Sequence, residues 1–165
     1  MFKFVKLFGN QYLGFWVFGL LLFAAQEIPY MVMPLFKLQT NLIMSMTESS
    51  RILDMFEKIL GSLCIAFMIF IVNKNSNLFL PAEDREKIFF MLSVTVLLLN
   101  FIGWGIYFSS RQSVFVMMFF IVLMPPLYYF FIGLWRENIL LTVTAIPFLI
   151  VHFIHVLGNL KLENK

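Results

Sequence analysis

The last apolar segment of the chain carries its most chemically capable side chains. His152, His155 and Asn159 follow one another at spacings of three and four residues, so on a helix they form one polar stripe. Imidazole groups can relay protons or bind metal ions near neutral pH. A zinc site needs a third and usually a fourth ligand, and the sequence has no other histidine. We therefore predict no metal and no other cofactor at this stripe.

Carboxyl groups in apolar surroundings form a second set of candidates. Glu27 follows Gln26 in the first apolar stretch, and Glu57 precedes another. A charged side chain at the centre of a membrane span costs about 2.5–3.5 kcal/mol on insertion scales, so it is a functional-site hypothesis by default. Asn100 and Trp104 are four residues apart in a third apolar stretch, which puts them on one helix face.

Other familiar chemistries have no motif in this chain. The single cysteine, Cys64, excludes an internal disulfide and every multi-cysteine metal or redox site. There is no glycine-rich phosphate loop, no G-x-S-x-G elbow and no H-E-x-x-H motif. The basic residues are scattered singly, which argues against binding nucleic acid. We predict no catalytic residue.

The composition identifies the environment of these residues. Hydrophobic residues make up 61% of the 165 positions and charged residues only 13%, whereas soluble domains have about 25% charged residues. A helix needs about 20 mostly apolar residues to cross a bilayer. We predict one all-α transmembrane domain over residues 1–165, with five spans at about 12–36, 52–72, 88–108, 114–135 and 139–160.

The second of these segments has a charge-free part that begins only at Ile59 and is too short to cross a bilayer by itself. Either Glu57 and Lys58 enter the membrane with the helix, or the segment does not cross and the bundle has four spans. Prolines interrupt two other segments. Pro29 and Pro34 predict a bend in the first, and the doublet Pro125-Pro126 predicts a break in the fourth.

Five spans alternate in direction, which allows depths to be compared between helices. The second span begins on the side opposite the N-terminus, and the third and fifth end there, so Glu57, Asn100 and His152 all lie about two turns from that surface. We therefore hypothesise a small polar cavity that binds or helps to move a small molecule or ion. Its expected residues are Gln26, Glu27, Glu57, Asn100, Trp104, His152, His155 and Asn159.

Two other functions are compatible with the same residues. Polar side chains in membrane bundles often only hold helices together, at about 0.6 kcal/mol each on average. The first alternative is therefore a non-catalytic interaction, assembly or immunity-like subunit. A weaker alternative is a membrane-embedded enzyme of lipid metabolism. The expected partners are membrane lipids, other membrane subunits or a second copy of the chain.

The orientation depends on the basic residues, which are enriched on the cytoplasmic side. The two sides tie at six each, and the N-terminal side leads by one charge if Lys58 is embedded in the membrane. We therefore expect a multi-pass protein of a bacterial plasma membrane with a cytoplasmic N-terminus. The N-terminal side holds Lys3, Lys6, Lys74, Arg85, Lys87 and Arg136, and the other side holds Lys37, Arg51, Lys58, Arg111, Lys161 and Lys165.

Overall fold

Long apolar helices make up most of the computed structural model, which describes residues 2–36, 38, 41–73, 81, 83–109 and 112–163. The helices are α1 (Val17–Val32), α2 (Leu42–Ser45), α3 (Arg51–Phe70), α4 (Asp84–Phe108), α5 (Val114–Val116), α6 (Met124–Trp135) and α7 (Ile139–Glu163), with a short 3-10 turn η1 (Met33–Leu35) and a π-helical segment η2 (Met117–Val122).

Four helical segments among the described residues are long and apolar enough to cross a membrane: Val17–Leu35, Asp84–Phe108, Val114–Trp135 and Ile139–Lys161. The predicted count of five is not confirmed. The predicted span that is missing from these four is α3, whose first half carries Asp54, Glu57 and Lys58. α3 nevertheless packs along α7.

Four of the basic residues used to predict the orientation, Lys37, Lys74, Arg111 and Lys165, lie outside the described residues.

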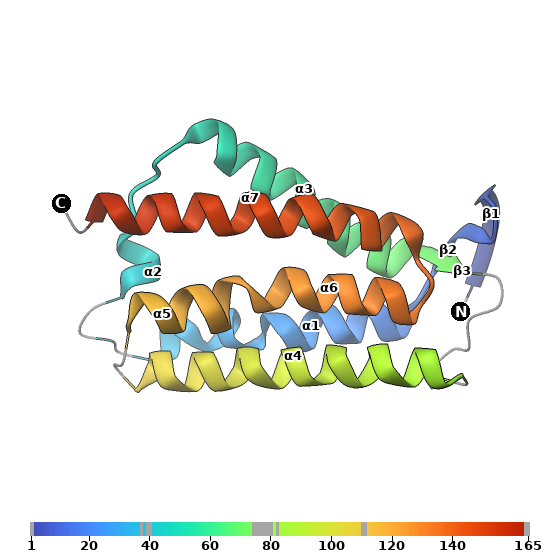
Figure 1. Ribbon diagram of the computed structural model, residues 1–165, viewed down its shortest axis with the longest axis horizontal. Coiled ribbons are helices and arrows are strands. Elements are labelled where there is room, and N and C mark those ends of the chain that lie inside the picture. Colours follow the sequence, from blue (N-terminus) through green and yellow to red (C-terminus); the bar gives the residue numbers. More distant parts are fainter. Residues whose placement is uncertain are drawn as a thin grey trace.

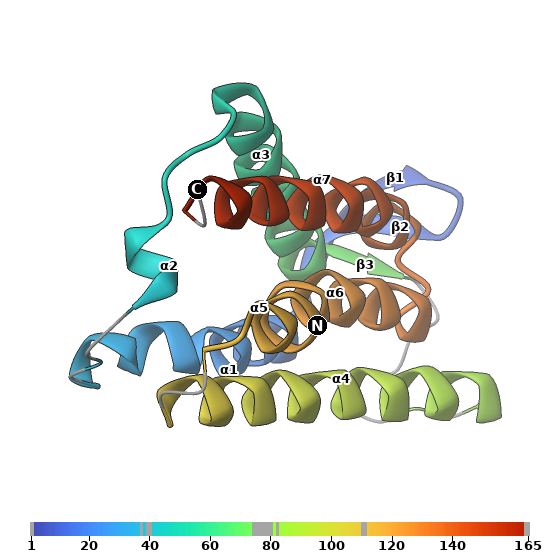
Figure 2. The ribbon, with the colours of Figure 1, turned by 60° about the vertical axis from the view of Figure 1, so that its left-hand side comes forward.

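The long helices run side by side and alternate in direction, with the two chain termini at opposite ends (Figure 1). A view turned by 60° shows α6 between α4 and α7, and α3 crossing beyond α7 (Figure 2). α1 lies beside α4 and also contacts α3. α6 is accordingly the most enclosed of the long helices, and Tyr128, Tyr129, Ile132 and Trp135 on it are all buried.

A small antiparallel sheet closes one end of the bundle, which we call the strand end. It consists of β1 (Phe2–Phe8), β2 (Gln11–Phe15) and β3 (Ile71–Asn73), in the order β1-β2-β3. The predominantly helical bundle agrees with the all-α prediction, and this short sheet is an addition that the prediction lacked. Residues 12–15 of the first predicted span are strand rather than helix, and α3 ends at Phe70 before β3.

Local sequence explains where the helices begin. The Ser50 hydroxyl accepts a hydrogen bond from the Leu53 amide and caps α3. Glu83 and Glu86 form a capping box, so α4 begins at Asp84, four residues before the predicted limit of the third span.

Pro34 and the doublet Pro125-Pro126 coincide with changes of helix type, whereas Pro29 lies within the continuous helix α1. Pro34 lies in η1, where α1 tightens into a 3-10 turn. Before Pro125 and Pro126 the fourth segment is π-helical, and the Leu123 amide donates to the Met118 carbonyl, five residues back. The predicted break in this segment is therefore present as a change of helix type rather than as a loop.

Candidate functional site

A pocket of about 270 Å³ lies between α1, α3, α6 and α7. We call it the four-helix pocket. A side chain in place of Gly61 would meet the Phe148 ring at 3.3 Å, so the glycine lets α3 and α7 approach closely beside it. The residues that line the pocket are Gln26, Glu27, Tyr30, Gly61, Ile65, Pro125, Tyr129, Phe148 and His152.

α1 contributes three polar side chains to this pocket. Gln26 is only 4% exposed; its side chain bonds to Tyr129, and its Oε1 atom has no hydrogen-bond partner among the described residues. Glu27 is half-buried. Tyr30 packs edge-on against the Trp104 ring at a centroid distance of 4.6 Å. A buried carbonyl oxygen is normally hydrogen-bonded. The Gln26 oxygen could therefore accept a hydrogen bond from a ligand in the pocket.

Glu57 joins α3 to α7 next to the pocket. Its Oε2 contacts Nδ1 of His155, and its Oε1 lies 3.1 Å from Nδ1 of His152. The His155 contact is a hydrogen bond, whereas Nδ1 of His152 is not aligned to make one with any described residue. One carboxyl group therefore lies between two imidazoles that are three residues apart on α7.

Asn159 fixes the hydrogen-bonding roles in this group. The Ser49 amide can only donate, and it donates to Oδ1 of Asn159 at 2.7 Å. The Asn159 amide nitrogen therefore faces Nε2 of His155, at 3.3 Å, and donates to it. Since Nε2 accepts, Nδ1 of His155 carries the hydrogen and donates to Glu57. His155 thus links Glu57 to Asn159, while Nδ1 of His152 lies 3.1 Å from Oε1 of Glu57 without an aligned hydrogen bond to any described residue.

Asn100 and Trp104 lie apart from this group. The Asn100 amide donates to the Phe120 carbonyl at 2.8 Å and is directed at η2. Trp104 is 1% exposed, and its Nε1 has no partner among the described residues. Trp104 reaches the pocket only through its contact with Tyr30. Of the eight predicted residues, Gln26, Glu27 and His152 line the pocket, and Glu57, His155 and Asn159 form the adjoining network.

Two tyrosines in the pocket are absent from the predicted set. Tyr30 follows Gln26 by four residues and Glu27 by three, so helical spacing would have placed it on the same side of α1. Tyr129 follows the proline doublet on α6, and no spacing in the sequence relates it to the carboxylates. Among the described residues, no group of three His, Cys, Asp or Glu side chains is placed to hold a metal ion.

Comparisons of the chain with protein-family models, with curated proteins and with solved structures find no match. The fold and the site therefore define a class: a small helical bundle whose long helices are apolar enough to cross a membrane, with a pocket between them that contains a carboxyl group, a free amide oxygen and an imidazole.

Proposed function

We propose that this protein binds a small organic cation in the four-helix pocket and helps to move it within the membrane. The observation that supports this most directly is that Glu27 and the free oxygen of buried Gln26 line one pocket. Both present acceptor oxygens, so both favour a ligand that carries N–H donors and positive charge.

Aromatic rings in the pocket fit the rest of such a ligand. Tyr30, Tyr129 and Phe148 line the pocket, and Phe148 stacks with the His152 ring at 5.3 Å. Ring faces attract cations, by about 2 kcal/mol or more where water is excluded. An ammonium group on an apolar body satisfies both the oxygens and the rings, whereas an anion would be repelled by Glu27.

The proposal is tested with three probes of one shape and different charge. Benzylammonium, benzyl alcohol and benzoate are titrated onto the purified protein by isothermal calorimetry. We expect benzylammonium to bind more tightly than the other two. Glu27→Gln should weaken binding of benzylammonium about tenfold, equivalent to about 1.4 kcal/mol, and leave benzyl alcohol unchanged.

Glu48→Gln is the matched control, because Glu48 is exposed and does not line the pocket. Equal binding of the three probes, or the same loss in Glu48→Gln as in Glu27→Gln, would contradict the proposal. Transport is then measured as uptake of benzylammonium by vesicles that contain the protein, again compared with Glu27→Gln.

A second candidate function, an interaction or assembly subunit, is favoured by a different observation. Glu57, His155, Asn159 and Asn100 all have hydrogen-bond partners within the bundle, as expected of residues that only hold helices together. If Glu27→Gln and His152→Ala lower the melting temperature without changing any ligand affinity, this second function is the better one.

The proposed topology has five spans, with α3 as the additional crossing and a cytoplasmic N-terminus in a bacterial plasma membrane. Lys3 and Lys6 lie in β1 at the strand end, and Lys161 lies at the end of α7, where the opposite side of the membrane would be. Cysteines are placed at Lys6 and at Lys161 in a Cys64→Ala background and treated with a thiol reagent that cannot cross membranes. We expect the cysteine at position 161 to react in intact cells and the cysteine at position 6 to react only after the cells are permeabilised. Reaction of both from outside would overturn this topology.

A further inference from the structure

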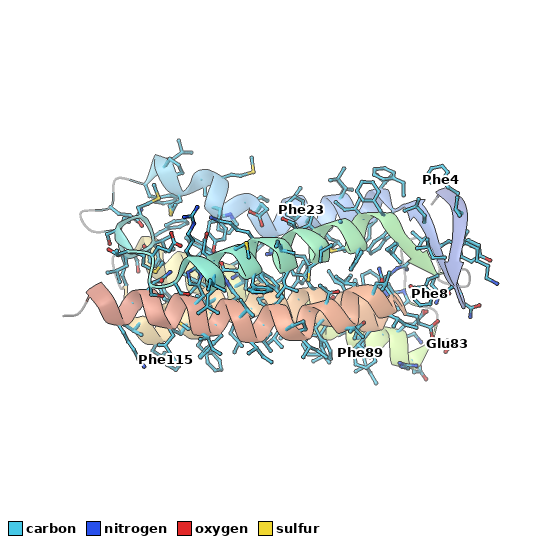
Figure 3. The ribbon with its side chains drawn as sticks, turned by 90° about the horizontal axis from the view of Figure 1, so that it is seen from above. Phe4, Phe8, Phe23, Glu83, Phe89 and Phe115 are labelled. Atoms are coloured by element: carbon cyan, nitrogen blue, oxygen red, sulfur yellow. The ribbon has the colours of Figure 1, made fainter. Side chains whose placement is uncertain are left out.

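The strand end has a pocket of its own, of about 500 Å³, which is separate from the four-helix pocket. Figure 3 shows Phe8 and Glu83 at this same end of the bundle, one from the sheet and one from the start of α4. The pocket is lined by Gly9, Asn10, Gln11, Asn73, Arg85, Gly133, Leu134, Glu137, Ile139, Thr142 and Val143. We call it the strand-end pocket.

One positive and one negative side chain line this pocket. Arg85 comes from the first turn of α4, and Glu137 from the turn between α6 and α7. Both are exposed. Oε2 of the Glu137 carboxylate accepts a long hydrogen bond of 3.3 Å from the Asn73 amide, and Oε1 has no hydrogen bond to any residue that the structure describes. The pair of opposite charges suits a ligand that carries both signs.

Gln11 adds a buried polar atom to the same pocket. Its side chain is 1% exposed, and its Nε2 donates to the Glu137 carbonyl at 2.8 Å. Its Oε1 has no hydrogen-bond partner among the described residues. An oxygen of this kind accepts hydrogen bonds and does not donate them, so the ligand group beside it must carry N–H or O–H.

One wall of the pocket is apolar, and this apolar surface continues along α7. Leu134, Ile139 and Val143 line the pocket. From there a row of branched side chains, about half or more exposed, follows one side of α7 at spacings of three and four residues, within a helix long and apolar enough to cross a membrane. The row consists of Ile139, Val143, Ile146, Ile150 and Ile154. A ligand with a charged head and a long apolar tail matches this arrangement.

We propose that the strand-end pocket binds a phospholipid whose headgroup carries a phosphate and a primary ammonium. The phosphate pairs with Arg85, and the ammonium donates hydrogen bonds to Glu137 and to Oε1 of Gln11. The acyl chains lie along the exposed row of α7. A quaternary ammonium has no N–H to donate to either oxygen. A glycerol headgroup can donate O–H to both oxygens but has no positive charge to pair with the Glu137 carboxylate, so its hydrogen bonds there are weaker. This site is independent of the proposed cation pocket.

The test is native mass spectrometry of the full chain, purified in detergent and mixed with equal amounts of phosphatidylethanolamine, phosphatidylcholine and phosphatidylglycerol that share the same acyl chains. We expect phosphatidylethanolamine to be retained about tenfold more than the other two, because a hydrogen bond to a charged group is worth at least that factor. Free phosphoethanolamine at the same concentration should not displace it, since it lacks the apolar tail.

Two variants separate the charges. Glu137→Gln should reduce the retention of phosphatidylethanolamine to that of phosphatidylcholine, and Arg85→Gln should reduce the retention of all three lipids. Lys87→Gln is the control for both, because Lys87 is exposed on the same turn of α4 and does not line the pocket. Equal retention of the three lipids by the wild type, or an unchanged preference in Glu137→Gln, overturns the proposal, and displacement by free phosphoethanolamine overturns the role of the acyl chains.

Discussion

The side-chain amide of Asn100 donates a hydrogen bond of 2.8 Å to the main-chain carbonyl of Phe120. In η2 the bonds join residues five apart, as from Leu123 to Met118. If the same spacing continued, the Phe120 carbonyl would accept from the main-chain amide of residue 125. That residue is Pro125, which has no N–H. Asn100 on α4 supplies the missing donor. The Asn100 side chain thus compensates for the main-chain hydrogen bond that is lost at the proline doublet of α6.

Replacing Asn100 tests this role. Asn100→Leu leaves the Phe120 carbonyl buried without a donor, which costs about 1–3 kcal/mol, so we expect a lower melting temperature in detergent. Thr95→Ala is the control on the same helix, because the exposed Thr95 hydroxyl donates to the Met91 carbonyl of its own helix and to no other residue that the structure describes. Equal melting temperatures for Asn100→Leu and wild type would show that the carbonyl needs no donor.

Two glycines of α4 give a paired test of packing. A Cβ atom at Gly103 would lie 2.2 Å from Cβ of Phe120, whereas one at Gly105 meets nothing within 4 Å. We expect Gly103→Ala to destabilise the bundle by about 1–3 kcal/mol through overpacking. Gly105→Ala should be neutral or slightly stabilising, because alanine is the better helix former. Thermal unfolding of the two variants decides whether α4 and η2 are as close as described.

The contact of Glu57 with the two histidines should contribute to stability. In Glu57→Gln one acceptor oxygen is replaced by an NH₂ group, and the remaining carbonyl oxygen is an uncharged and weaker acceptor for Nδ1 of His155. We therefore expect a loss of about 1–3 kcal/mol. Asp54→Asn, one turn earlier, removes an ion pair with Lys58 whose ammonium is largely exposed, and such pairs contribute at most about 1 kcal/mol. If both variants unfold at the same temperature, the Glu57 network does not hold α3 to α7.

Arg136 is buried at the strand end between two indoles. Its guanidinium carbon lies 4.5 Å from the Trp16 ring centre and 5.4 Å from that of Trp135. Burial lowers the pKa of Arg136 to about 10, against the opposing effect of the Glu86 carboxylate, so the guanidinium stays charged at neutral pH. Arg136→Met should cost about 2 kcal/mol and change the tryptophan fluorescence, whereas Lys87→Met should do neither.

Glu137 has a backbone conformation that favours glycine, with φ of 49°. It follows α6, and the Asn138 amide donates to the Gly133 carbonyl as in a helix-ending turn. We expect Glu137→Gly to stabilise the protein by up to about 1 kcal/mol. Gly9 has the same φ of 49°, so Gly9→Ala should have the opposite effect. A lower melting temperature for Glu137→Gly would mean that the Asn73 contact outweighs the backbone strain.

The sequence indicates the helices well, because crossing a bilayer requires long apolar stretches and little else. Segments 88–108, 114–135 and 139–160 match α4, the α5–α6 unit and α7 closely. The sheet was missed, although Phe2–Phe8 alternates and Gly9-Asn10 is a typical turn. Apolar residues from Leu13 onward suit a span as well as a strand. Whether these residues form a strand depends on their pairing with Ile71–Asn73. Local sequence patterns do not indicate this pairing, because the two segments are far apart in the chain.

Depth was predictable for the site, whereas helix rotation was not. Alternating directions place Glu57 level with His152 and His155, and these side chains do meet although 95 or more residues separate them in the chain. The same argument puts Asn100 at that level, but its side chain is directed at η2. Rotation of a helix about its axis depends on which neighbour each side packs against. In α4, apolar residues occur on all sides of the helix after its charged first turn, so the local sequence gives no signal for that choice.

The three-stranded sheet has a consequence for how the bundle is assembled. β2 immediately precedes α1, and β3 immediately follows α3. Because β2 pairs with β3, the sheet sets the position of α1 along its axis relative to α3. A growing chain reaches its first apolar helix well before Ile71–Asn73 has been synthesised. The position of α1 along its axis relative to α3 is therefore fixed only after the later strand has been synthesised.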